Sequence, residues 1–354
     1  SCMKSHARSR TPALSVRSRA LPARLHALGL TALLALAGTG CSSPSKPATP
    51  PPAAEAKKDA PAAPPVAAPP AADAPLTLQT YTSSEGNASV NSYLLVGQKD
   101  ALLIDAQLVN SEAVKLAQLI KESHHTLRTI YVTHPHPDHF MGLEVLHREF
   151  PDAEILARPQ VAERMPELYE RYKAPLNRFF PGDVAQGVVT PKSFTGPSLT
   201  LEGQELKLLE FQDGESKFAT AVYAPSLKAL FCADLVYNHV HPWLNEMHVD
   251  GVLRHVKEVR ALPGVETVYP GHGGPLRQEH LGEYEAYVND FLKMAETAPD
   301  AEALIKAVSE KYADFRTQAG LRFSANAHIA ARDEAQGKSA KPKAGAKDKK
   351  KAAK

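Results

Sequence analysis

The sequence is poor in cysteine and in long apolar runs, and both scarcities exclude a class of protein. Three cysteines in 354 residues are too few for a disulfide framework. The apolar stretch at residues 28–38 spans only about ten residues, which is too short to cross a bilayer core as a helix. With 43% hydrophobic residues, the chain still has enough apolar side chains for one large or two ordinary domains.

Acidic residues are almost missing from both ends of the chain. Residues 1–40 hold six Lys/Arg and no acidic residue, and residues 338–354 hold eight Lys and one acidic residue. The intervening residues 76–337 hold 24 basic and 35 acidic residues, so the formal charge of +2 conceals a body with a net charge of −11. Phosphate binding needs clustered cations, and we therefore predict that nucleic acid is not a partner.

The basic start and the apolar stretch after it predict a secretory signal over residues 1–40. The stretch ends in Gly38-Thr-Gly-Cys41, which resembles a bacterial lipoprotein signal with Cys41 as the lipidated first residue of the mature protein. Gly38 departs from that pattern, in which an aliphatic residue usually stands three before the cysteine. A plain cleaved signal and an uncleaved anchor are the alternatives. The interpretation implies a lipoprotein facing the periplasm and anchored to a membrane through Cys41, in the outer membrane rather than the inner.

Two segments outside the folded domain are predicted to be disordered. Residues 41–75 are a predicted tether, because residues 44–75 hold 11 Pro and 12 Ala and cannot bury enough apolar area to fold. At ~3.1 Å per residue in a polyproline II conformation, the tether would reach ~100 Å. Residues 337–354, rich in Lys and Ala, are predicted to be a solvated tail, with contact to anionic lipid as the alternative. The folded domain is thus predicted to span residues 76–336.

Within that domain, short β-rich runs alternate with helical patterns. Strands are expected at residues 76–81, 89–96, 101–105, 129–133, 154–157, 199–201, 206–211, 220–223, 230–233 and 266–269. Helices are expected at residues 110–122, 142–149, 159–183, 251–260, 279–297 and 301–312. Two mixed sheets with helices outside each would form a four-layer α/β sandwich, although periodicity alone does not select that arrangement over other α/β folds.

The segment with the most chemistry is residues 133–139, which read Thr-His-Pro-His-Pro-Asp-His. It follows a predicted buried strand, whose rigid end can hold side chains in place. His134 and His136, two residues apart, can face one metal ion, and Asp138 and His139, after the turn, can face a second. Imidazole and carboxylate together suit Zn²⁺, with iron or manganese as alternatives.

This segment resembles the signature of the metallo-β-lactamase superfamily, and the resemblance extends over about residues 76–275. Asp234, at the end of an apolar strand, matches the family's bridging carboxylate, and His272 matches its final histidine. Asp105 matches the acid that ends an early strand and supports the site from behind. The resemblance implies an α/β fold of the four-layer αββα type.

One position departs from the family pattern. Where most members have a histidine, this chain has Glu215. One interpretation is loss of a ligand, which leaves one metal ion or none and an inactive protein. The other is substitution, since carboxylate oxygen ligates Zn²⁺ at distances similar to imidazole nitrogen. The segment from Glu215 to Asp234 is similar to that of the superfamily's alkylsulfatases, which carry a glutamate here and bind two zinc ions, and we therefore favour ligation by Glu215.

The resemblance implies a metal site of seven residues, His134, His136, Asp138, His139, Glu215, Asp234 and His272. One ion is expected on the first two histidines and Glu215, and the other on Asp138, His139 and His272, with Asp234 bridging. Zinc can lower the pKa of a bound water to about 7. The implied activity is that of a hydrolase in which a metal-bound hydroxide cleaves an ester-like bond, with Asp138 as a candidate proton acceptor.

The predicted substrate is a small molecule, and its class is left open among lactones, thioesters, sulfate esters and related compounds. Glu215 argues against a true β-lactamase, and the acidic body argues against a nuclease. His241 and Trp243 follow the strand of Asp234 and are candidate substrate contacts, with packing as the alternative. The aromatic residues of the expected helix 159–183 are candidates for a lid.

A second hypothesis belongs to another class of protein. A non-catalytic binding or scaffold lipoprotein could keep the metallo-β-lactamase fold without hydrolysing anything. The retention of six of the expected ligands argues against it. The sequence leaves the oligomeric state open.

Overall fold

The computed structural model describes residues 75–338. The predicted signal with Cys41, the tether and most of the predicted tail lie outside the described residues and stay predictions. Within the described part, no helix combines the length and apolar character needed to cross a membrane.

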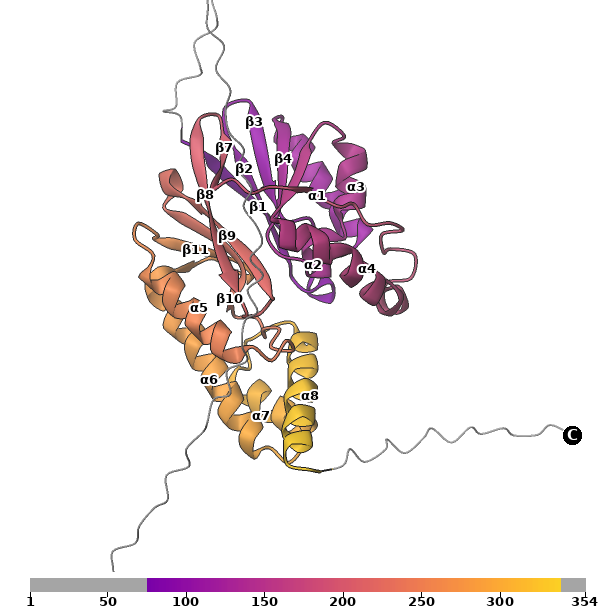
Figure 1. Ribbon diagram of the computed structural model, residues 1–354, viewed down its shortest axis with the longest axis vertical. Helices are drawn as coiled ribbons and strands as arrows, with labels where there is room; N and C mark the ends of the chain where they lie inside the picture. The colour runs from indigo at the N-terminus through magenta and orange to yellow at the C-terminus, as the bar shows by residue number, and fades with distance from the viewer. Residues whose placement is uncertain (1–74, 339–354) are drawn as a thin grey trace, which may run out of the picture. The chain divides into compact units, whose positions relative to one another are not determined.

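In the part of the chain that the structure describes, two sheets of six strands form the centre of the fold (Figure 1). The first sheet has its strands in chain order, β1 (Thr77–Thr82), β2 (Asn91–Val96), β3 (Asp100–Ile104), β4 (Thr126–Val132), β5 (Glu154–Ala157) and β6 (Lys192–Ser193). The second has the order β12 (Leu276–Arg277), β11 (Thr267–Gly273), β10 (Ala229–Asn238), β9 (Phe218–Ala224), β8 (Gln204–Gln212) and β7 (Ser198–Leu201). Both sheets are mixed, because β3–β6 are parallel in the first and β10–β11 in the second.

Three apolar clusters separate four layers. The cluster between the sheets draws on both, for example Leu102 and Tyr131 from the first and Phe231 from the second. The other face of the first sheet packs against α1 (Asn110–Glu122), α3 (Leu143–Glu149) and α4 (Pro159–Phe179). The other face of the second packs against α5 (Val249–Ala261) and α6 (Leu281–Thr297), with α7 (Ala301–Lys311) and α8 (Gln318–Ala335) beyond them. The predicted four-layer αββα sandwich is confirmed (Figure 1).

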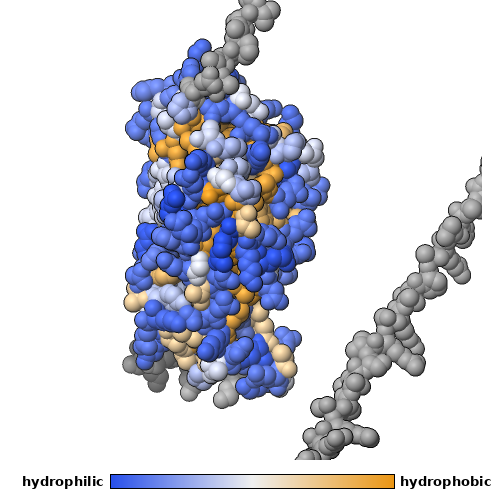
Figure 2. Space-filling view, turned by 90° about the vertical axis from the view of Figure 1, so that its left-hand side faces the viewer, coloured by the Kyte–Doolittle hydropathy of each residue, from blue (hydrophilic) through white to orange (hydrophobic). Residues whose placement is uncertain are grey.

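Helices α5 and α6, which cover the second sheet, are amphipathic, as their sequence pattern predicts. Figure 2 shows the molecule from the left-hand side of Figure 1, where hydrophilic residues predominate and hydrophobic residues appear in patches between them. Helices α5 and α6 bury valines and aromatic rings on one side only. This amphipathic pattern is what allowed their positions to be predicted.

Two helices differ from the sequence-based prediction. Helix α8 was not predicted, and the helix expected at residues 159–183 ends at Phe179. The buried side of α8 carries Gly320, Ser324, Ala325 and His328 as well as two large apolar residues. Small and polar residues give little hydrophobic periodicity, and the helix was therefore not recognised.

Candidate metal centre

The loop after β4 presents four of the predicted ligands. Pro137 begins the short helix α2 (Pro137–Phe140), and His136 before it has the extended backbone that a following proline favours. This turn brings the His139 ring beside the His134 ring, with centroids 4.2 Å apart, and places Asp138 Oδ2 3.7 Å from His139 Nε2. His134 and His139 are fully buried, whereas the side chains of His136 and Asp138 are 13% and 20% exposed.

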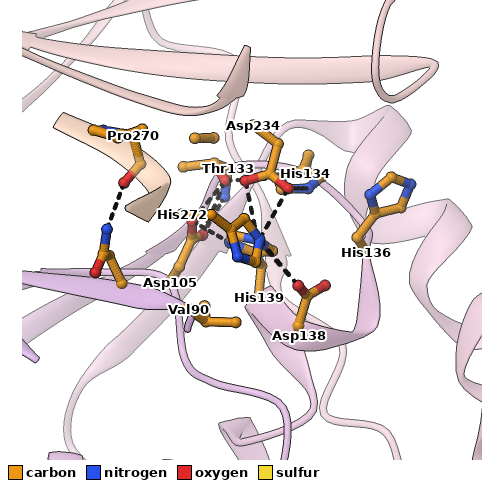
Figure 3. Close-up of polar contacts among 12 residues, drawn as sticks. Val90, Asp105, Thr133, His134, His136, Asp138, His139, Asp234, Pro270 and His272 are labelled. Carbon is orange, nitrogen blue, oxygen red and sulfur yellow. Dashed lines mark hydrogen bonds and ion pairs between the residues drawn. The ribbon is translucent and has the colours of Figure 1, made fainter. Parts of the chain in front are cut away.

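Asp105 lies behind this loop, where the sequence placed it (Figure 3). It follows β3 with φ of 63°, a left-handed conformation that aims its carboxylate at the loop. The carboxylate accepts hydrogen bonds from the backbone N–H of Thr133 at 2.9 Å and from its hydroxyl, and lies 2.8 Å from His139 Nδ1. Thr133 Oγ1 also lies 3.0 Å from His134 Nδ1. Asp105 and Thr133 thus orient both buried histidines through Nδ1, and each histidine presents its Nε2 to the site.

Asp234 and His272 come from the parallel strands β10 and β11 of the second sheet. His272 Nε2 lies 3.2 Å from Asp234 Oδ2 and 3.2 Å from Asp138 Oδ2. The other nitrogen of His272, Nδ1, lies 2.7 Å from the carbonyl of Ala88. Gly271 is required here, because a Cβ at this position would lie 2.0 Å from Asp234 Oδ1.

Glu215 reaches the site from the hairpin between β8 and β9. Its side chain is buried, with Oε1 2.9 Å from His136 Nδ1 and Oε2 3.8 Å from His134 Nε2. The hairpin lies at the same edge as the end of β10, because β9 runs antiparallel to β10. Glu215 therefore occupies the place that the sequence assigned to it, although the site's usual residue there is an imidazole.

The seven predicted ligands gather into two groups that share Asp234. The Glu215 group consists of His134, His136, Glu215 and Asp234, and the His272 group consists of Asp138, His139, Asp234 and His272. Within each group, the potential ligand atoms lie within 4.8 Å of one another. This division is the one predicted from the sequence.

The polar atoms at the centre of the site fit metal ions. His134 Nε2, His139 Nε2 and Asp234 Oδ1 are buried and have no hydrogen-bond partner among the described residues. His139 Nε2 lies 3.3 Å from Asp234 Oδ1 without a hydrogen bond. This arrangement is expected for two ligand atoms that both point at one metal ion. Buried polar atoms are almost always satisfied, and imidazole with carboxylate is a donor set that zinc prefers. The residues present therefore fit a dinuclear zinc site.

Electrostatics in the His272 group favour ionised carboxylates beside protonated imidazoles. Burial opposes ionisation of Asp138 and Asp234, but the neighbouring His139 and His272 outweigh it, so the pKa of each carboxyl lies below its usual value. Burial likewise opposes protonation of His272, but Asp234 and Asp138 raise its pKa to about 10. A bound cation would displace these protons and take over their role as the positive partner.

The Glu215 group has a different balance. Burial raises the pKa of Glu215 to about 7, although His136 acts in the opposite direction. Burial opposes protonation of His136, but Glu215 raises its pKa to about 9. Burial, together with His139, lowers the pKa of His134 well below its usual value, so that this imidazole is neutral.

The loop after β10 borders the open side of the site. His136 Nε2 lies 3.8 Å from Glu246 Oε1, and Trp243 and Glu246 line a shallow pocket together with Glu215. The predicted substrate contact of Trp243 therefore stays a prediction with support from its position. Burial raises the pKa of Tyr172 of α4; Arg171 opposes this effect, and the carboxylates of Glu246 and Asp138 add to it.

His241 does not lie at the mouth of the site. It is 1% exposed, its Nδ1 lies 2.8 Å from the hydroxyl of Tyr287, and its Nε2 lies 3.1 Å from Gln318 Nε2. Both ring nitrogens are occupied in the interior, against α6 and α8, so the structure favours the packing alternative for this residue. The unpredicted helix α8 is the physical reason, because it covers the loop at this point. Among the aromatic residues proposed for a lid, Tyr169 is buried against Ala185 and is part of the core.

Sequence reasoning missed two contributors to the site. The hydroxyl of Tyr237 donates a 2.6 Å hydrogen bond to Asp234 Oδ2. Gly271 leaves the space that Asp234 occupies. Tyr237 could not be found from spacing, because residues 234 and 237 of a regular strand point to opposite faces. Gly271 could not be found because its contact with Asp234 joins two strands.

A two-sheet αββα sandwich with histidine and carboxylate clusters at its strand ends defines a class of metal-binding proteins. The chain belongs to the metallo-β-lactamase superfamily, whose family model matches residues 86–301, more than half of the chain. Members of this superfamily are generally metal-dependent hydrolases that act on small molecules.

Solved structures agree with the fold. A metallo-β-lactamase family protein from Thermus thermophilus matches with a TM-score of 0.52 and 21% identity, over 70% of this chain and 92% of that one. A β-lactamase domain protein from Burkholderia ambifaria matches with a TM-score of 0.51 and 15% identity, over 70% of this chain and 82% of that one. No curated protein matches significantly by sequence. At these identities the similarity shows the fold alone.

Proposed function

We propose that this chain is a dinuclear, zinc-dependent hydrolase that cleaves an ester-like bond in a small molecule. The observation that carries the proposal is the pair of four-residue groups sharing Asp234. Bound zinc ions would supply Lewis acidity and a water-derived nucleophile at neutral pH. Iron or manganese in place of zinc would use the same residues.

The chain's own residues divide the work between the back and the front of the site. Asp105, Thr133 and the carbonyl of Ala88 orient the buried imidazoles from behind. Asp138 lies on the open side, and its carboxylate stays ionised because His139 and His272 outweigh the effect of burial on its pKa. It is therefore placed to accept a proton from a water or a substrate that enters the site.

Two acidic residues, Glu215 and Glu246, limit the substrate class. Glu215 replaces a neutral imidazole by a carboxylate, so it lowers the positive charge of a bound metal pair and makes the ions weaker Lewis acids. The acidic Glu246 beside His136 adds negative charge at the mouth. Both features disfavour polyanionic substrates such as nucleic acids. Lactones, thioesters and sulfate esters of small molecules remain in the proposal.

Metal analysis of the purified protein tests the proposal most directly. We expect about two zinc ions per chain, and hydrolysis of at least one compound in a panel of chromogenic esters, lactones and sulfate esters. Glu215→Ala is expected to lower the metal content. A protein that binds no metal, or a Glu215→Ala variant with unchanged metal content and rate, would contradict the assignment.

Membrane attachment through Cys41 is part of the same proposal. It is supported by the basic and apolar residues before this cysteine and by the Pro/Ala-rich residues after it. A lipoprotein facing the periplasm would present the hydrolase domain to small molecules there. Metabolic labelling with a radioactive fatty acid should label the wild type but not Cys41→Ser, and an unlabelled wild type would overturn the lipid anchor.

A further inference from the structure

Tyr237 contacts proposed ligands of both metal groups. Its hydroxyl donates a 2.6 Å hydrogen bond to Asp234 Oδ2 and lies 3.4 Å from Glu215 Oε1. Its ring stacks on His272, with centroids 5.1 Å apart and planes 6° apart. The side chain is only 4% exposed. One residue thus touches the shared carboxylate and one further proposed ligand from each group.

An irregularity in β10 turns Tyr237 toward the site. In a regular strand, residues three apart point to opposite faces. Strand β10 alternates between the core of the two sheets and the helix side as far as Cys232. At Ala233 the backbone takes φ of 48°, and the pairing with β11 shifts register on both sides of this residue. The bulge places Asp234 and Tyr237 on the same side, and bulges commonly re-aim side chains next to active sites.

We propose that Tyr237 is a positioning residue of the metal centre. Its hydroxyl holds the carboxylate of Asp234, and its ring holds the imidazole of His272, in the orientations that metal binding needs. The inference rests on the proposed function, because it requires Asp234 and His272 to be metal ligands. Partners of this kind change metal affinity by about 10- to 100-fold when they are removed from other metal sites.

Tyr284 on α6 offers a matched control. Its ring lies 6.0 Å from that of Tyr237, and its hydroxyl is buried without a hydrogen-bond partner among the described residues. Tyr237→Phe and Tyr284→Phe each remove one buried hydroxyl and keep the ring. Only the first removes a hydrogen bond to a proposed ligand.

The experiment compares metal binding by the full chain and these two variants. Zinc affinity is measured by competition with a chromophoric chelator, and the visible absorption of the cobalt-substituted proteins reports ligand geometry. Tyr237→Phe is expected to weaken binding of at least one zinc ion by about tenfold or more and to change the cobalt spectrum. Tyr284→Phe is expected to leave both unchanged.

Three results would overturn the inference, and they can be told apart. Unchanged affinity and spectrum in Tyr237→Phe remove the positioning role and leave the proposed function intact. Equal losses in both variants, with equal falls in melting temperature before metal is added, assign Tyr237 to packing alone. A wild-type protein that binds neither zinc nor cobalt refutes the proposed function, and the inference with it.

Discussion

The two metal groups share Asp234 but are held in place differently. In the His272 group, the outward nitrogens of both histidines meet buried acceptors, the carboxylate of Asp105 and the carbonyl of Ala88. In the Glu215 group, His134 has such support from Thr133 Oγ1, but His136 has Glu215 on one side and the exposed Glu246 on the other. Because outer contacts preorganise ligands, the His272 group should bind its ion more tightly and the Glu215 group should exchange its ion more readily.

The largest effect is expected for Asp234, the residue that the two metal groups share. Asp234→Asn removes charge from the residue that both groups share, so both ions should be lost or severely weakened. We expect less than about 1% of wild-type activity, since even outer partners cost up to about 100-fold in affinity or activity. Elemental analysis after dialysis measures the metal content. Retention of two ions would show that Asp234 does not belong to both groups.

Removing one ligand from each group tests the difference directly. Glu215→Ala should leave a protein with about one zinc ion, whereas His272→Ala should weaken the tighter group and leave less metal after dialysis. We expect at least about a 100-fold loss of activity in both, because each group loses a direct ligand. Glu215→His serves as the control and should retain two ions. Identical metal contents in Glu215→Ala and His272→Ala would break the comparison.

Loss of an outer support should affect the His272 group more than the Glu215 group. Asp105→Asn weakens the direct contact to His139 Nδ1, and we expect zinc affinity to fall by about 10- to 100-fold for the ion of the His272 group. The loss should be smaller for the other ion, because Asp105 reaches His134 only through Thr133. Chelator competition measures the two affinities. Glu202→Gln is the control, because Glu202 accepts hydrogen bonds from backbone N–H groups of residues 98–100, at the start of β3 and away from the site. Equal weakening of both ions by Asp105→Asn would contradict the stronger support of the His272 group.

Zinc should stabilise the protein more as pH rises. The pKa of His136 is raised to about 9 and that of His272 to about 10, so protons compete with metal below these values. These protonated imidazoles stabilise the fold below the usual pKa of 6.5, and that contribution is lost as pH rises toward 9 or 10. Each proton released makes zinc affinity rise about tenfold per pH unit.

The measurement is the rise in melting temperature on adding zinc, followed from pH 6 to pH 8. A larger rise at pH 8 is expected, and a smaller one would show that these imidazoles do not bind the metal. Magnesium is a suitable control, because it prefers oxygen ligands to imidazole.

The smallest effect concerns the loop beyond the metal groups. Trp243→Ala opens the shallow pocket beside Glu215, so KM should rise by a few-fold while metal content stays unchanged. His241→Ala instead removes buried contacts to Tyr287 and Gln318 and should lower the melting temperature by several degrees, as typical losses of about 1–3 kcal/mol do. An effect of His241→Ala on KM alone would place this residue at the substrate.

Local patterns predicted most of the fold because they follow burial. Helix α1 and strand β5 have the predicted bounds, since their apolar residues repeat with the period of a helix or follow a short buried run. Helix α8 was not predicted because the polar residues Ser324 and His328 face its buried side, where they form hydrogen bonds to the loop of residues 242–244. That pairing joins segments about 80 residues apart, and no local pattern reports it.

The sequence by itself determined the identity of the proposed metal ligands and their division into two groups. Strand ends are rigid, so the order of histidines and carboxylates along the chain carried that information. Only the tertiary structure decided what lies behind and beside them. The bulge at Ala233 turns Tyr237 onto Asp234, and α8 withdraws His241 from the mouth of the site. Both outcomes depend on backbone register and on contacts between distant segments, which a residue's neighbours in the sequence do not specify.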